Sequence, residues 1–154
     1  MTAPRRCRRS WMHWPDLLMT PATPAPLRAA VIGCGAISEE HLDYLAPSPR
    51  VDLVGVCDLS RATATWTADH YHTAAFTDHR RMMEIAAPDV VHILTPPRSH
   101  VPLAREVLEL GSHVVVEKPA ASTADELADL YALAEASGRL LMENQNYRYN
   151  DGTR

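Results

Sequence analysis

The sequence alternates short runs of β-branched residues with segments of helical period from residue 29 onward. This alternation is typical of a parallel sheet with helices on its faces, because each parallel strand needs a crossover segment before the next. Six strands are expected: Ala29–Ile32, Asp52–Cys57, Ala74–Phe76, Val90–Leu94, His113–Val116 and Arg139–Met142. Five helices are expected between them: Ile37–Leu45, Arg61–His70, Asp78–Ala86, Val101–Leu110 and Ala124–Ala136. The pattern predicts an α/β fold with a doubly wound, mostly parallel sheet of about six strands.

The size of the chain, 154 residues, suits one domain with a full core and is too short for two ordinary ones. Hydrophobic residues make up 46% and charged residues 22%, and no apolar stretch approaches the length of a membrane span. The cysteines Cys7, Cys34 and Cys57 form no C-x-x-C pair, and the last two lie in apolar contexts typical of buried free thiols. We therefore expect a soluble, cytoplasmic protein with no metal site and no membrane partner.

Residues 1–26 differ in composition from the rest, with four arginines, five prolines and a single acid. A twin-arginine export signal is disfavoured because His13, Pro15 and Asp16 break the apolar stretch that such a signal needs. We expect a disordered leader at 1–26, a domain at 27–150 and a tail at 151–154. Beyond the leader the chain carries 11 basic and 18 acidic residues, which argues against a nucleic-acid surface.

A glycine turn, Gly33-Cys34-Gly35-Ala36-Ile37-Ser38, follows the first expected strand. Gly33 permits a tight turn, and Gly35 lets the backbone approach a pyrophosphate at the N-terminus of the next helix. Ser38 replaces a third glycine, and its small side chain still permits close packing of helix on strand. By itself the turn is a weak signal, because tight strand-to-helix turns also occur for structural reasons.

Asp58 ends the second expected strand, at the position where a carboxylate accepts hydrogen bonds from the hydroxyls of an adenosine ribose. The order of strand, glycine turn, helix, strand and acid predicts a Rossmann-type dinucleotide site. A carboxylate there would repel a 2′-phosphate, so NAD is favoured over NADP. Arg61 is open to two interpretations, a contact with adenine or a phosphate and a solvated residue of the first helical turn.

Two other strand ends carry polar or rigid residues. Thr95, Pro96 and Pro97 end the fourth strand, and Ser99 and His100 follow before the next helix. The prolines form either a rigid cleft edge or a simple strand terminator, and His100 is either a site residue or a cap. The segment from Glu143 to Arg148 either binds a carboxamide or sugar or is an ordinary polar exit loop.

Glu117, Lys118 and Pro119 follow a β-branched run, where open α/β sheets place their ligands. Lys118 in a partly desolvated cleft would stay cationic beside a carboxylate and donate to a substrate or ribose hydroxyl. The alternative is an ion pair on a loop, which stabilises little.

The G-C-G-A-I-S turn, the V-C-D strand end and the T-P-P-R-S-H, E-K-P and N-Y-R-Y segments together resemble the Gfo/Idh/MocA family over residues 29 to about 149. The resemblance covers that family's amino-terminal dinucleotide-binding domain. It implies an NAD(P)-dependent oxidoreductase that moves a hydride between nicotinamide and a hydroxyl of a sugar or polyol. The candidate cofactor-binding residues are Gly33, Gly35, Ala36, Ile37, Asp58, Arg61, Thr95, Pro96, Pro97, His100, Glu117, Lys118, Asn146 and Arg148. Glu117 and Lys118 are also the candidate catalytic residues.

The resemblance further implies a second domain that supplies a catalytic Asp and His, and no residue of this chain matches them. We therefore expect a truncated or split sugar or polyol dehydrogenase, weak or inactive alone, with an exposed apolar surface that favours self-association. The alternative is a stand-alone nucleotide-binding module with a regulatory or interaction role. A methyltransferase is disfavoured because that chemistry does not require E-K-P at a strand end.

Overall fold

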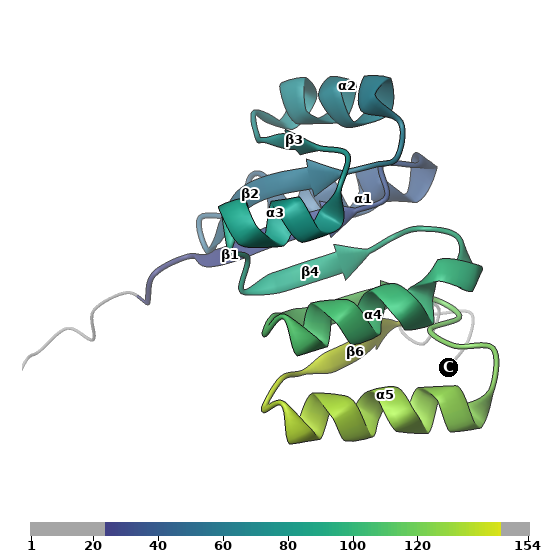
Figure 1. Ribbon diagram of the computed structural model, residues 1–154. Helices are drawn as coiled ribbons and strands as arrows, with labels where there is room; N and C mark the ends of the chain where they lie inside the picture. The colour runs from purple at the N-terminus through teal and green to yellow at the C-terminus, as the bar shows by residue number, and fades with distance from the viewer. Residues whose placement is uncertain (1–23, 146–154) are drawn as a thin grey trace, which may run out of the picture.

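The computed structural model describes residues 24–145, which form one six-stranded sheet flanked by helices (Figure 1). The strands are β1 Leu27–Ile32, β2 Val51–Cys57, β3 Ala75–Phe76, β4 Val90–Ile93, β5 His113–Glu117 and β6 Leu141–Asn144. The helices are α1 Ala36–Leu45, α2 Arg61–Tyr71, α3 His79–Ala86, α4 His100–Glu109 and α5 Ala124–Ala136, with a short 3₁₀ helix, η2, at Pro97–Ser99. The order β3-β2-β1-β4-β5-β6, with every neighbouring pair parallel, confirms the predicted doubly wound Rossmann-type fold.

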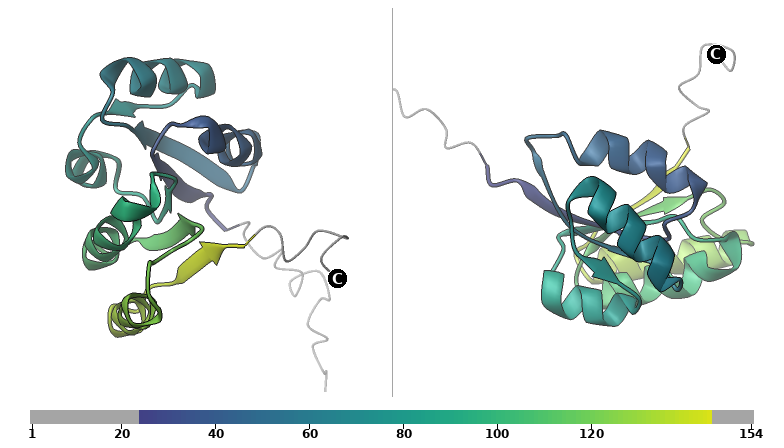
Figure 2. Two further views of the ribbon diagram at one scale, coloured as in Figure 1. Left: turned by 90° about the vertical axis from the view of Figure 1, so that its right-hand side faces the viewer. Right: turned by 90° about the horizontal axis from the view of Figure 1, so that it is seen from above.

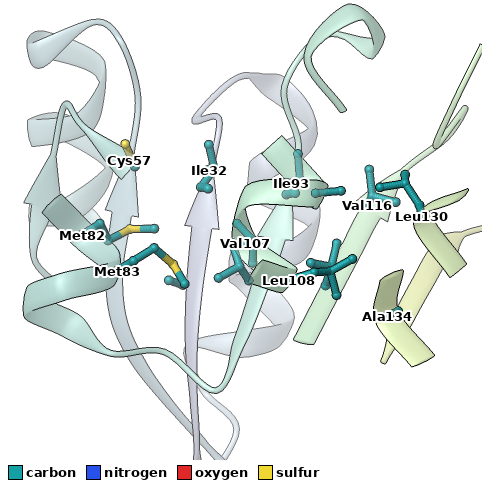
Figure 3. Packing of buried hydrophobic residues seen from close by; sticks show 14 of the residues in the cluster. Ile32, Cys57, Met82, Met83, Ile93, Val107, Leu108, Val116, Leu130 and Ala134 are labelled. Carbon is teal, nitrogen blue, oxygen red and sulfur yellow. The ribbon is translucent and has the colours of Figure 1, made fainter. Parts of the chain in front are cut away.

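Two apolar clusters, one on each face of the sheet, form the core. Helices α3, α4 and α5 cover one face. Met82 lies near Cys57 of β2, and Leu108 and Leu130 lie near Ile93 and Val116 (Figure 3). On the other face, α1 and α2 cover mainly β1 and β2 through residues such as Leu42 and Ala68. Figure 2 shows no described helix over β5 and β6 on this second face. Within residues 24–145, no helix therefore covers this side of β5 and β6.

The helix boundaries follow from local capping. Thr123 and Glu126 form the predicted capping box at the start of α5, and Ser60 and Asp78 cap α2 and α3. The 3₁₀ helix at Pro97–Ser99 was not predicted.

The last strand begins two residues later than predicted. The Arg139 N–H donates to the carbonyl of Ala134, which extends the end of α5 through Gly138 at a φ of 65°. Arg139 is thereby tied to the helix end, and β6 starts only at Leu141.

The predicted leader lies almost wholly outside the described residues, which include only its last three positions, 24–26, without secondary structure. Among residues 24–145, no helix has the length and apolar character that a membrane crossing requires.

Candidate functional site

The carboxyl ends of the parallel strands meet at one edge of the sheet, where the strand order reverses between β1 and β4. The predicted site residues that the structure describes follow β1, β2, β4 and β5 at this edge (Figure 1). Asn146 and Arg148 lie outside the described residues.

Gly33 occupies a conformation and a space that only glycine fits. Its φ is +97°, and a Cβ there would lie 2.9 Å from the backbone of Leu94 and Thr95. Its N–H donates to the carbonyl of Cys57 at 2.8 Å, which ties the turn to β2. Gly33 therefore brings the ends of three strands close together.

Gly35 differs from Gly33, because nothing in the described protein explains the missing side chain. Its φ is −78°, and a Cβ would meet no atom within 4 Å. It is the N-cap residue of α1, and no side chain caps that helix end. Open space beside uncapped N–H groups fits the approach of a pyrophosphate to Gly35, Ala36 and Ile37.

Ser38 takes the place of the third glycine, as predicted from its size. It is 2% exposed, and its hydroxyl donates to the carbonyl of Gly35 at 2.6 Å. Cys34 also packs inside the turn, and burial raises the pKa of its thiol to about 11, so the thiol stays neutral.

Asp58 lies directly beside the glycine turn. One carboxylate oxygen accepts from the Cys34 N–H at 3.0 Å, and the other accepts from the Ser60 N–H at 2.8 Å. Each carboxylate oxygen has a second lone pair, so the group can still accept from ribose hydroxyls. The half-buried carboxylate is thus fixed next to the expected pyrophosphate position.

Arg61 is exposed at the start of α2 and lines an open pocket with Phe76, Thr77 and Arg81. Arg61 follows Asp58 by three positions, and both residues of β3 line the pocket as well. Arg81 is engaged by Glu84 at 2.8 Å. The location suits an adenine base, which keeps the first interpretation of Arg61 open.

The segment after β4 is braced by His100. The ring is 1% exposed, and its nitrogens lie 2.6 Å from the carbonyl oxygen of Thr95 and 2.8 Å from that of Pro119. It joins the segments after β4 and β5 and holds Thr95 in place. A direct contact of this buried ring with nicotinamide stays a prediction, whereas Pro96 and Pro97 are exposed and free to line a cleft.

Glu117 and Lys118 point to different environments. Glu117 is 6% exposed, and Lys118 is exposed, with its ammonium 3.7 Å from a Glu117 carboxylate oxygen. The peptide bond between Lys118 and Pro119 is cis. Burial by itself raises the pKa of Glu117, but hydrogen bonds from Asn144, His41 and the Lys118 N–H, together with the Lys118 charge, bring it below its usual value. Glu117 is therefore a carboxylate at neutral pH, and the pair is more than an exposed ion pair.

The sequence analysis missed two residues, His41 and His92, which contact this site from α1 and β4. Their Nδ1 atoms lie 2.9 Å apart, and His41 Nε2 lies 3.2 Å from Glu117. One feature of the sequence could have indicated this contact. His92 lies between two buried residues of a central strand, where a polar ring needs a hydrogen-bond partner. No three His, Cys, Asp or Glu side chains in residues 24–145 are grouped so as to hold a metal ion.

The arrangement defines a dinucleotide-binding domain, and comparison with known proteins places it in a family. A model for an oxidoreductase family with an NAD-binding Rossmann fold, Gfo/Idh/MocA, matches residues 27–145. The chain belongs to this Gfo/Idh/MocA oxidoreductase family, as its motifs predicted.

Three relatives illustrate the match. D-glucoside 3-dehydrogenase of Escherichia coli K12 is 33% identical over 82% of this chain and 37% of its own length. KijD10, a 3-ketoreductase from Actinomadura kijaniata solved with NADP and TDP-benzene, is 25% identical with a TM-score of 0.77, over 81% of this chain and 39% of that one. The WlbA dehydrogenase from Bordetella pertussis, solved with NADH and UDP-GlcNAcA, is 26% identical with a TM-score of 0.78, over 83% of this chain and 39% of that one. This chain thus spans less than half the length of these relatives.

Proposed function

We propose that this chain binds NAD at the glycine turn and serves an oxidoreductase that transfers a hydride between nicotinamide and a hydroxyl of a sugar or polyol. The observation that carries the proposal is the Asp58 carboxylate held 3.0 Å from the Cys34 N–H, beside the open space at Gly35. These groups match the ribose and pyrophosphate of a dinucleotide. When bound, the nicotinamide ring supplies the hydride acceptor or donor.

Preference for NAD over NADP is the finer part of the proposal. Relatives with NADP and with NADH are both known, so their names do not decide it. Asp58 favours NAD because a fixed carboxylate repels a 2′-phosphate. Arg61 and Arg81 line the neighbouring pocket, and their positive charges would instead favour the 2′-phosphate of NADP, although Arg81 already pairs with Glu84.

The proposed roles at the nicotinamide end fall on Lys118 and Glu117. Lys118 would donate a hydrogen bond to the reacting hydroxyl or to the ribose, and Glu117 would keep the ammonium in place. Lys118 alone is a poor base at neutral pH, so we propose that turnover needs residues of a second domain. The sugar dehydrogenases among the relatives support a sugar or polyol as substrate.

A calorimetric titration of the protein with NAD tests the binding proposal. We expect saturable binding of one NAD per chain, with weaker binding of NADP. Titration with ADP-ribose, which lacks the nicotinamide ring, is the control for binding through the adenosine and pyrophosphate groups. Absence of heat with all three ligands for a protein folded by circular dichroism would refute the proposal and leave an interaction module as the alternative.

We also propose that the chain self-associates, which the side of β5 and β6 without a described helix supports. Met142 on β6 and Leu140 just before it are 53% and 71% exposed. Exposed large apolar side chains favour association. Light scattering over a concentration series should show mass increasing with concentration, and a constant monomer mass would contradict this.

A cytoplasmic location stays a proposal, supported by the two buried free thiols Cys34 and Cys57.

A further inference from the structure

A chain of polar side chains joins four elements on the inner side of the Glu117–Lys118 pair. It runs from His92 on β4 to His41 on α1, then to Glu117 at the end of β5, where Asn144 of β6 joins it. The side chains of His41 and Glu117 are only 10% and 8% exposed. Side chains of α1 and β6 therefore contact the Glu117 carboxylate of β5 directly, and His92 of β4 reaches it through His41.

The distances determine where the protons lie. A carboxylate only accepts, so His41 Nε2, 3.2 Å from Glu117 Oε1, donates its proton there. The Asn144 amide nitrogen lies 3.3 Å from the same Nε2 and donates instead to Glu117 Oε1. The two Nδ1 atoms, 2.9 Å apart, share a single proton, because two facing N–H groups would repel. Neutral His41 is therefore the Nε2–H tautomer and accepts from His92 Nδ1, and protonated His41 donates to both neighbours.

The surroundings decide the charge of His92. Burial, together with the nearby His41, lowers the pKa of His92 to about 4. His92 is thus neutral at physiological pH. Glu40 and Tyr44 of α1 line the same pocket as the two rings, and Lys118 faces Glu117 from the other side.

The two oxygens of the Glu117 carboxylate contact different groups. Oε1 accepts from His41 and Asn144, whereas Oε2 faces the backbone N–H of Lys118 at 3.2 Å and its ammonium at 3.7 Å. The contacts to Oε1 therefore fix the direction in which Oε2 points. Without them the buried carboxylate would lose two hydrogen-bond donors, which would raise its pKa and free it to rotate.

We propose that His41 is a positioning residue that orients Glu117, and through it Lys118, toward the nicotinamide end of the site, and that His92 holds the His41 ring in the required tautomer. The inference rests on the proposed contact of Lys118 with nicotinamide or its ribose. It adds two histidines of α1 and β4 to a site that sequence motifs confine to the strand ends.

Nuclear magnetic resonance of the labelled protein tests the hydrogen-bonded chain without any cofactor. Nitrogen shifts should show His41 Nε2 protonated at every pH at which the protein is folded, and His92 neutral down to about pH 5. The pKa of the Glu117 carboxyl should rise in His41→Leu and stay near the wild-type value in His41→Gln, whose amide can donate from the same place. A bare His41 Nε2 in wild type, which needs no variant to detect, would overturn the proposal.

Binding measurements on the same variants test the consequence for the site. His41→Leu should weaken NADH binding about fivefold, the effect of one lost hydrogen bond, and leave ADP-ribose binding unchanged. His41→Gln should restore NADH affinity, and His70→Leu, at an exposed histidine of α2, should change neither ligand. Equal loss for both ligands, or no loss for either, would overturn the positioning role. Failure of wild type to bind either ligand would instead refute the proposed function, while the resonance data still report on the chain.

Discussion

Replacing Gly33 with alanine should destabilise the protein by about 3 kcal/mol or more. A φ of +97° costs a residue with a Cβ about 1–3 kcal/mol. The added methyl would also lie 2.9 Å from the backbone atoms of Leu94 and Thr95, which cannot move as a flexible side chain can. Overpacking of this kind costs about 1–3 kcal/mol more. Urea unfolding followed by circular dichroism measures the loss, which is a large part of the stability of an ordinary domain.

Gly35→Ala is the matched control, two residues further along the same turn. Its backbone conformation suits any residue, and its Cβ would enter open space, so stability should change by less than about 0.5 kcal/mol. NAD affinity, in contrast, should fall at least about tenfold, because the methyl group would occupy the path of the pyrophosphate. Equal stability of the Gly33 and Gly35 variants would contradict the turn described here, and unchanged NAD binding by Gly35→Ala would contradict the location of the pyrophosphate.

The fold was predictable because its signals are local. β-branched runs indicate the strands, and the start and stop signals of the predicted helices come from residues next to them in the sequence. The boundary error at β6 has a local cause that propensity does not show, since Arg139 hydrogen-bonds back to the end of α5. The glycine turn and Asp58 were also predictable, because a short motif and a fixed spacing bring them together.

The surroundings of Glu117 were not predictable, because they depend on contacts between distant segments. His41 and Glu117 are 76 positions apart, and Asn144 is a further 27 beyond Glu117. Their meeting follows from the order of β4, β5 and β6 in the sheet and from the rotation of α1, which no local pattern specifies. His100 shows the same limit, since its position at a helix start did not reveal that both ring nitrogens contact backbone carbonyls.

The second large effect is expected for Asp58→Asn, which should reverse or abolish the preference for NAD over NADP. The asparagine can keep one acceptor for the Cys34 or Ser60 N–H, so the turn should stay folded. Loss of the charge removes the strong acceptor for the ribose hydroxyls and the repulsion of a 2′-phosphate. Each effect amounts to about tenfold in affinity, so the ratio of the two dissociation constants should change by about a hundredfold.

Asp52→Asn provides the matched control for this change in charge. Asp52 lies near the opposite end of the same strand, where its exposed carboxylate is 3.4 Å from Arg28. The Asp52→Asn substitution alters the net charge by the same amount as Asp58→Asn, but it lies far from the glycine turn. Calorimetric titration should therefore give an unchanged ratio of NAD to NADP affinity. If Asp58→Asn weakened both cofactors equally, Asp58 would act only by holding the turn through the Cys34 N–H. The pocket lined by Arg61 and Arg81 would then determine the choice of cofactor.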